Sequence, residues 1–305
     1  MALKGKFEEK HIVVKILQWL VCIFLLSIPA MGSLFLFSQP LTTSALKWVQ
    51  FLQSSAMFLL PPFVMAYLWS QKPLEWLKLA STKETGSKSS GSNCLWAIGI
   101  MLVALPAINM LSLWNQQIAL PAFLEPLEAW MKAKEEEAGL LTDQFLNVTT
   151  LGGLLVNLLL LALLPAVSEE LTFRGVLQGL MTKIERQGVP HMAIWCTAIL
   201  FSAIHMQFYG FVPRMLMGAL FGYMLAWTGS MWIPILMHMT NNAMAVLLSF
   251  VGLRAGWDME MVDSIGAGDT LWLGIVSMVI TVVGIYAFRR STTMSKASSR
   301  MSSGS

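Results

Sequence analysis

The sequence predicts an all-α, polytopic membrane protein with about eight transmembrane helices and with both the N- and C-termini in the cytoplasm. Hydrophobic residues make up 56% of the 305 residues and charged residues only 12%, and the mean hydropathy is +0.64. The apolar residues gather in long stretches that reach the roughly 20 residues needed to cross a bilayer. A soluble domain has about twice this share of charged residues, so we expect an integral membrane protein in contact with lipid.

Hydropathy places the eight spans near residues 14–37, 47–70, 94–113, 150–182, 190–207, 211–228, 232–250 and 270–288. The first follows three lysines, as a signal peptide does, but it is longer than the apolar region of a signal peptide and many spans follow. We therefore expect it to be retained. Proline and glycine occur inside several spans, which membrane helices tolerate. The three cysteines show no CxxC or Cys/His spacing, so neither a disulfide framework nor a cysteine metal site is predicted.

Lysine and arginine are biased toward one side of the predicted membrane. If the N-terminus is cytoplasmic, the inside segments carry Lys4, Lys6, Lys10, Lys72, Lys78, Lys83, Lys88, Lys183, Arg186, Arg289, Arg290, Lys296 and Arg300. The outside loops hold Lys132, Lys134 and Arg254, with Lys47 and Arg214 at span edges, and they also hold most of the acids. This bias indicates an even number of spans with both ends inside. The net charge of +3 is too small and too scattered for a nucleic-acid-binding protein.

One short segment concentrates ionisable residues directly after an apolar stretch. Glu169, Glu170 and Arg174 follow residues 151–167. Glu170 and Arg174 are i,i+4 neighbours with the acid first, which is the favourable order for a salt bridge on a helix. Glu169 is rotated by about 100° from Glu170 and has no local cation. It is therefore a candidate general base.

Two later spans carry histidines. His205 lies near the C-terminal end of the fifth span, and His238 and Asn242 are i,i+4 partners on one face of the seventh. Taken singly, each polar residue also fits a structural role, as a cap at a helix end or as a hydrogen-bonding group between helices. Ionisable groups at membrane depth are costly, however, and as a set they mark function. We expect these side chains to converge if the fourth helix continues past Arg174.

The same residues form three motifs: EExxxR at 169–174, FxxxH at 201–205 and HxxxN at 238–242. The order and spacing of these motifs resemble those of the CPBP family of intramembrane endopeptidases. This family contains CAAX proteases and bacteriocin-processing enzymes and is also called the Abi family. The FRG sequence after the glutamates and the segment 228–232 (TGSMW) add to the resemblance, which covers about residues 150–250.

The resemblance implies a membrane-embedded peptidase that hydrolyses a peptide bond of a membrane-associated peptide. The substrate would be a CAAX-type prenylated protein or a bacteriocin- or leader-like peptide. By position, Glu169 and His205 would activate a water, and His238 and Asn242 would stabilise the oxyanion. Asn241 stands beside Asn242, so which of these two amides faces the site stays open.

The resemblance further implies that Glu170 and Arg174 form a structural ion pair. A metal-free mechanism is preferred for the family, so no cofactor is required on this interpretation. A divalent metal such as zinc is the alternative, and its ligands would be Glu169, His205 and His238, which are acceptable zinc donors. The sequence does not decide between the two mechanisms.

Other functions were weighed against this one. The HExxH and GxSG motifs of other intramembrane proteases are absent, and the GxGD sequence at 266–269 lacks a second aspartate in another span. We interpret it as a polar turn that opens the last helix. A non-catalytic membrane scaffold or bacteriocin self-immunity factor stays open as an alternative. A transporter with a proton relay would be favoured by an inverted repeat or paired broken helices, and the sequence shows neither.

This interpretation divides the chain into four parts. Residues 1–145 form the first three spans with their loops, and residues 146–252 form the CPBP-like catalytic core of spans four to seven. Residues 253–290 form an outside loop and the eighth span, and residues 291–305 form a disordered tail rich in Ser, Lys and Met. The outside loop before the fourth span contains a solvated helix at 130–137. We expect a bacterial cytoplasmic (inner) membrane protein whose substrate is presented near the cytoplasmic half of the bilayer.

Overall fold

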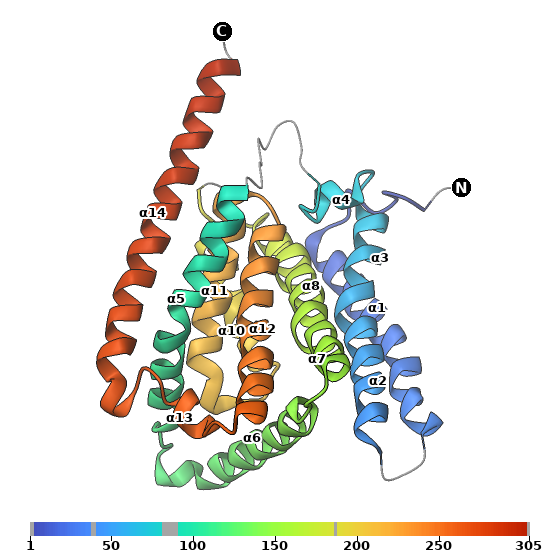
Figure 1. The fold of residues 1–305 in the computed structure, drawn as a ribbon. Coiled ribbons are helices and arrows are strands. Elements are labelled where there is room, and N and C mark those ends of the chain that lie inside the picture. Colours follow the sequence, from blue (N-terminus) through green and yellow to red (C-terminus); the bar gives the residue numbers. More distant parts are fainter. Residues whose placement is uncertain (1–2, 38–40, 81–90, 186–187, 304–305) are drawn as a thin grey trace.

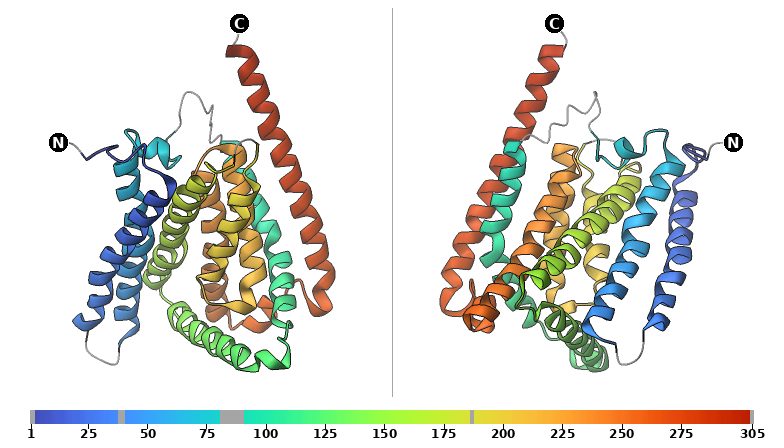
Figure 2. Two further views of the ribbon diagram at one scale, coloured as in Figure 1. Left: turned by 180° about the vertical axis from the view of Figure 1, so that it is seen from behind. Right: turned by 45° about the vertical axis from the view of Figure 1, so that its right-hand side comes forward.

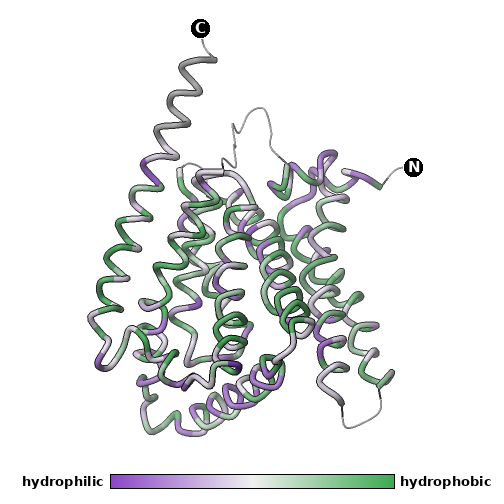
Figure 3. Tube along the Cα trace, viewed as in Figure 1, coloured by the Kyte–Doolittle hydropathy of each residue, from purple (hydrophilic) through white to green (hydrophobic). Residues whose placement is uncertain are grey.

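The computed structural model is a bundle of helices joined by short loops, and it describes residues 3–37, 41–80, 91–185 and 188–303. No β-strand occurs in these ranges, which confirms the all-α fold class. Seven of the described helices are long and apolar enough to cross a membrane. Figure 3 shows hydrophobic residues along most of their length.

The α-helices of the described residues are α1 (Ile12–Gly32), α2 (Thr43–Ser54), α3 (Leu60–Trp69), α4 (Pro73–Trp76), α5 (Gly91–Gln116), α6 (Glu125–Leu146), α7 (Leu151–Asn157), α8 (Leu164–Glu170), α9 (Gly179–Met181), α10 (His191–Ala203), α11 (Phe211–Thr228), α12 (Trp232–Ala255), α13 (Met259–Asp263) and α14 (Leu271–Ser303). The helices α1 to α3 form one side of the bundle, α5 and α14 form the other, and α7 to α12 lie between them (Figures 1 and 2). The described ends of the chain both lie at the same end of the bundle (Figure 1).

The helices α7, α8 and α9 belong to one continuous helix of 31 residues, Leu151–Met181. This helix continues past the glutamates, as the sequence predicted. Two π-helical stretches widen it, at Leu158–Leu163 and Leu171–Gln178. The first directly precedes the turn that contains Pro165, whose ring would crowd the carbonyl four residues earlier, and the wider turn accommodates it. The second span repeats this arrangement, with a π-helical stretch at Ser55–Leu59 just before its two prolines.

The fifth expected span is shorter than predicted. The helix α10 has 13 residues and is therefore about 20 Å long, which is less than the hydrocarbon thickness of a bilayer. The chain turns after Ala203, and Met206 adopts a positive φ of 55°. His205 consequently lies in a turn inside the bundle and not in a helix that continues to residue 207.

The helix α6 lies across the end of the bundle opposite to the chain termini (Figures 1 and 2). It has 22 residues and is longer than the predicted solvated helix at 130–137. The backbone N–H of Tyr209 donates to Glu135 Oε2 at 3.2 Å, and Asn157 Nδ2 donates to the carbonyl of Phe145 at 2.8 Å. These bonds fasten α6 to the start of α11 and to α7, so α6 caps this end of the bundle.

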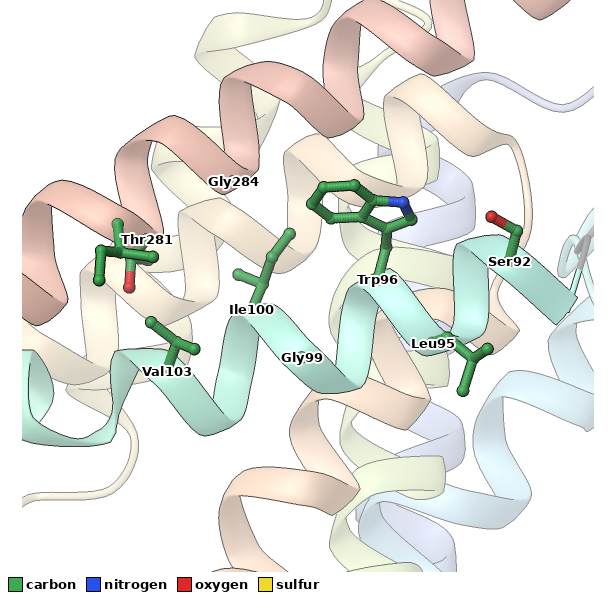
Figure 4. Close-up of a pocket in the computed structure, with 9 residues that line it drawn as sticks. Ser92, Leu95, Trp96, Gly99, Ile100, Val103, Thr281 and Gly284 are labelled. Carbon is green, nitrogen blue, oxygen red and sulfur yellow. The ribbon is translucent and has the colours of Figure 1, made fainter.

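The helices α5 and α14 pack against each other at the edge of the bundle, with a cavity of about 590 Å³ between them (Figure 4). Trp96, Ile100 and Val103 line it from α5, and Thr281 lines it from α14. A Cβ at Gly284 would lie 3.4 Å from Ile100, an ordinary van der Waals contact. None of the residues that line this cavity is ionisable, so it offers no acid–base or metal chemistry.

The C-terminal segment differs from the sequence-based expectation. The helix α14 continues to Ser303 and so runs through most of the tail that we expected to be disordered, residues 291–305. The segment contains no glycine or proline before Gly304, and a helix that has begun in an apolar span propagates at low cost. The GxGD sequence forms the turn before α14, as predicted, with Asp269 exposed.

Candidate active site

Two helices and the turn after α10 bring one carboxylate and two imidazoles together. Glu169 Oε2, at the end of α8, lies 3.8 Å from Nε2 of His205 and 3.9 Å from Nε2 of His238. Their side chains are 16%, 26% and 8% exposed, respectively. The sequence-based expectation that these residues converge is therefore met in the structure.

Glu170 points away from Glu169 and holds two partners. Its Oε1 accepts a hydrogen bond from Arg174 Nη1 at 3.0 Å and lies 2.9 Å from His238 Nδ1. The side chains of Glu170 and Arg174 are both 0% exposed. The predicted ion pair is present, and the structure adds that the same carboxylate orients His238. This contact could not be predicted from local spacing, because the two residues are 68 positions apart.

Hydrogen bonds fix which ring nitrogen of each histidine carries a hydrogen. His205 Nδ1 lies 2.7 Å from the carbonyl oxygen of Phe201, which can only accept, so Nδ1 must donate. His238 Nδ1 faces the Glu170 carboxylate in the same way. Both rings therefore turn Nε2 toward Glu169, and Nε2 of a neutral ring with this tautomer is an acceptor.

Phe201, the first residue of the FxxxH motif, packs at the centre of this group. Its ring centroid lies 4.5 Å from the Arg174 guanidinium, 5.0 Å from the His205 ring and 5.9 Å from the His238 ring. Arg174 Nη2 also donates to the carbonyl of Gly218 at 2.9 Å. A Cβ at Gly218 would lie 3.2 Å from both Arg174 and Phe201, so the glycine makes room for the stacked cation.

Glu169, Phe201, His205 and His238 line a cavity of about 370 Å³. Phe145 and Leu146 of α6 also line it. Since α6 lies opposite to the termini (Figure 1), the cavity extends into the half of the bundle away from them. The substrate was instead predicted to lie near the cytoplasmic half of the bilayer, which is the half that contains the termini in the predicted orientation.

Both asparagines of the HxxxN motif region line the cavity. Asn241 Nδ2 donates to Asn242 Oδ1 at 3.2 Å. The Asn242 oxygen is thereby occupied, and its two N–H groups stay available as donors. The question left by the sequence therefore has a structural answer: both amides reach the cavity, and one orients the other.

Glu169 Oε2 is buried and has no hydrogen-bond partner among the described residues. Buried polar atoms in proteins are nearly always satisfied by protein or by ordered water. The separations of 3.8 Å and 3.9 Å from the two imidazole nitrogens are too long for direct hydrogen bonds. A water between them has two hydrogens and could donate to two of these three acceptors, and such bridges form where polar contacts exceed about 3.5 Å.

The Glu169 carboxylate and the two imidazoles are also donors of the types that zinc binds. Zinc binds histidine nitrogen and carboxylate oxygen at about 2.0–2.2 Å, so two tetrahedral ligands lie roughly 3.4 Å apart. The donor types fit, but the separations at Glu169 Oε2 are longer than this. Within the described ranges, no group of three or more His, Cys, Asp or Glu side chains is arranged to hold a metal ion.

The cavity wall contains one charged residue that the sequence motifs did not predict. Arg214 lies in the first turn of α11 and lines the same cavity as Glu169 and His205. It stood at the edge of a predicted span and outside every motif. A cation beside an apolar stretch is a recognisable signal, but only the fold shows which cavity it reaches.

Comparison with known proteins identifies the part of the chain that carries these residues. Residues 151–244 match the family described as type II CAAX prenyl endopeptidase Rce1-like. This domain belongs to the CPBP family of CAAX proteases. All three motifs, from Glu169 to Asn242, fall inside the matched residues.

The chain is also similar to a curated protein. The "Uncharacterized protein YpbD" of Bacillus subtilis (strain 168) is 29% identical over 113 residues, which cover 35% of this chain and 54% of that protein. The match thus spans about half of the length of this relative. No solved structure matches the chain. The N-terminal spans lie outside the CAAX protease domain.

Proposed function

We propose that the protein is an intramembrane endopeptidase that hydrolyses a peptide bond of a membrane-associated peptide through a water activated by Glu169 and His205. The observation that carries this proposal is the unpartnered, buried Glu169 oxygen between two imidazole nitrogens. Membership of the domain in the CAAX protease family supports the same reaction class. A CAAX-type prenylated protein or a leader-like peptide is the proposed substrate.

In the proposed mechanism, Glu169 takes a proton from the bound water as the water oxygen attacks the scissile carbonyl carbon. His205 accepts the second water hydrogen at Nε2 and thereby orients the attacking lone pair. The tetrahedral intermediate then collapses with cleavage of the C–N bond. Glu169 returns its proton to the leaving amine, so proton and electron pairs balance over the cycle.

The oxyanion of the intermediate needs donors. Asn242 can donate from its free amide, because Asn241 occupies its oxygen. His238 can donate from Nε2 only when its ring carries both hydrogens, since Nδ1 faces Glu170. The charged ring would then lie 2.9 Å from the Glu170 carboxylate. The oxyanion would then have one charged donor, His238, and one neutral donor, Asn242.

A cleavage assay with purified protein in lipid nanodiscs tests the proposal. Wild type is compared with Glu169→Gln and His205→Ala on a prenylated C-terminal peptide and on a leader peptide. We expect wild type to cleave at least one of them and either substitution to lower kcat by about 10²–10⁴-fold, the usual contribution of a general base. Equal cleavage by wild type and Glu169→Gln would refute the mechanism.

Metal dependence is tested in the same assay. The proposal uses Glu169, His205 and His238 without a metal, so we expect EDTA or 1,10-phenanthroline to leave kcat/KM unchanged. If zinc is required, these three residues would hold it and it would polarise the bound water. Loss of activity on chelation, restored by added zinc, would replace the metal-free mechanism.

A scaffold or self-immunity function makes the opposite prediction for the same variants. In that case Glu169→Gln would keep the biological activity in cells, because no reaction depends on the free carboxylate. Arg174→Ala would still unfold the protein. The two functions are therefore separated by one substitution that leaves the ion pair intact.

A further inference from the structure

The cavity contains a guanidinium that the reaction above does not use. Arg214 of α11 is partly buried and lines the cavity together with Glu169, His205 and His238. No carboxylate of the described residues forms an ion pair with it. An arginine at such a position is costly unless something compensates its charge.

The position of Arg214 on its helix adds to this cost. It occupies the fourth residue of α11, which begins at Phe211. The N-terminal turn of a helix carries partial positive charge and favours anions over cations. The site therefore has two sources of positive potential, the guanidinium and the helix terminus, and both favour a negatively charged group in the cavity.

The guanidinium is held in place by neutral groups. Nη1 donates to the carbonyl of Gln207 at 3.2 Å, and Nη2 donates to Gln207 Oε1 at 2.8 Å. Gly210 lies under it, and a Cβ there would lie 3.2 Å from Nη2. Because these bonds fix the planar fork without neutralising it, Arg214 is preorganised to bind a carboxylate.

The carboxylates near Arg214 do not form a salt bridge with its guanidinium. Glu135 of α6 and Glu169 are the carboxylates whose charges act on Arg214, but neither comes within ion-pair distance. Glu169 is turned toward the two histidines, and Glu135 accepts from the backbone of Tyr209. A ligand carboxylate can therefore reach the guanidinium without displacing an existing salt bridge.

The geometry of the cavity indicates which part of a peptide would carry that carboxylate. The cavity of about 370 Å³ extends from Glu169 to Phe145 and Leu146 of α6. A space of this size holds a few residues, and Thr142, Phe145 and Leu146 of α6 form part of its wall. A carboxylate bound in this cavity therefore lies close to the scissile bond.

Resting on the proposed peptidase function, we propose that Arg214, positioned by Gln207, is a specificity-determining residue that binds a carboxylate of the substrate within a few residues of the scissile bond. The carboxylate is either the C-terminal group of the peptide or an acidic side chain. Both present the same planar pair of oxygens, which a guanidinium binds with two parallel hydrogen bonds.

The test uses matched peptides that differ only in charge. One pair carries a free C-terminal carboxylate or a C-terminal amide, and a second pair carries Asp or Asn near the cleavage site. Wild type, Arg214→Gln and Arg214→Lys are compared. The control variant is Arg254→Gln, which removes an exposed cation at the end of α12.

We expect wild type to prefer one charged peptide over its neutral partner by about 10- to 100-fold in kcat/KM, the usual effect of a charge-assisted hydrogen bond. Most of this preference should be in KM. In Arg214→Gln the preference should disappear, in Arg214→Lys it should be partly retained, and in Arg254→Gln it should stay as in wild type. Whichever pair shows the preference identifies the source of the carboxylate. Equal cleavage of charged and neutral partners by wild type would overturn the proposal, and so would an undiminished preference in Arg214→Gln.

A binding measurement separates this inference from the proposed function. The affinity of the inactive Glu169→Gln protein for the charged and neutral peptides is measured with and without Arg214→Gln. Carboxylate-selective binding that requires Arg214, without cleavage by wild type, would refute the peptidase and support the subsite. Cleavage by wild type together with unselective binding would refute the subsite alone.

Discussion

Two adjacent glutamates differ in function because their surroundings differ. Glu170 is completely buried and bonded to both Arg174 and His238, whereas the side chain of Glu169 keeps 16% exposure and borders the cavity. A buried charge without partners would cost several kcal/mol, so Glu170 is committed to its ion pair. Glu169 Oε2 has no hydrogen-bond partner among the described residues, so it can accept a hydrogen bond from a water.

The buried ion pair predicts a large effect on stability. Arg174→Ala leaves the Glu170 carboxylate buried with its main cation removed, and we expect a loss of about 3–5 kcal/mol. Thermal unfolding in nanodiscs measures this loss as a lower Tm. Glu169→Gln should keep a Tm near that of wild type. A Tm of Arg174→Ala equal to that of the exposed control Arg254→Ala would show that the pair is dispensable.

The two asparagines predict an asymmetric pair of variants. Asn242→Ala removes a donor to the oxyanion, and loss of one such donor usually lowers kcat by about 10²–10³-fold. Asn241→Ala removes only the group that orients Asn242, so we expect a smaller loss. Steady-state kinetics on the cleaved peptide compares them. A larger loss for Asn241→Ala would assign the oxyanion contact to Asn241 instead.

At the scale of helices, close approach depends on small residues in α11. Gly218 and Gly222 lie one turn apart and face the long helix 151–181, and their carbonyls accept from Arg174 and Gln178 at 2.9 Å and 3.2 Å. This small-xxx-small spacing is typical of tightly packed membrane helices. It brings α11 close enough to support the cation of the site.

A pair of glycine substitutions tests this packing. A Cβ at Gly222 would lie 2.7 Å from Gln178 Oε1 and 3.0 Å from Ile194, whereas a Cβ at Gly99 of α5 meets nothing within 4 Å. We expect Gly222→Ala to lower the Tm, because the helices must separate. Gly99→Ala should keep or raise the Tm, since alanine favours a helix over glycine by about 1 kcal/mol. Equal changes of Tm in both variants would show that the packing around α11 tolerates an added methyl group at Gly222.

For the whole molecule, the important relation is between the cavity and the two ends of the bundle. The described chain ends lie at one end and α6 lies at the other (Figure 2). Residues of α6 line the cavity, which therefore extends toward that second end. The lysine and arginine bias predicts cytoplasmic termini. With that orientation the cavity extends toward the outside, and in the proposed function the peptide would enter from that side.

Cysteine labelling tests this orientation in intact cells. Single cysteines are introduced at Glu137 on α6 and at Lys72 before α4, whose side chains are both 72% exposed, after Cys22, Cys94 and Cys196 are replaced by alanine. We expect a membrane-impermeant maleimide to label Glu137→Cys at once and Lys72→Cys only after permeabilisation. The reverse pattern would show that α6 lies on the cytoplasmic side and that the cavity extends toward the cytoplasm.

Much of the fold was predictable from local properties. Spans are set by hydropathy over about 20 residues, and the bounds of most agree with the structure because each span satisfies its own backbone. The fifth span was the exception, because sequence periodicity does not show that α10 ends at Ala203 inside the bundle. The Glu170–Arg174 pair was also predictable, since its partners are one helical turn apart.

The sequence by itself determined the membrane-protein class, the residues of the candidate site and the ion pair, because apolar length, motif spacing and i,i+4 contacts are local properties of the chain. Only the tertiary structure decided that Glu170 also orients His238, that Arg214 reaches the same cavity as Glu169, and that this cavity extends toward α6. The physical reason is that these relations join residues on different helices. Their distances depend on how the helices cross, and small residues such as Gly218 and Gly222 in α11 set those crossings.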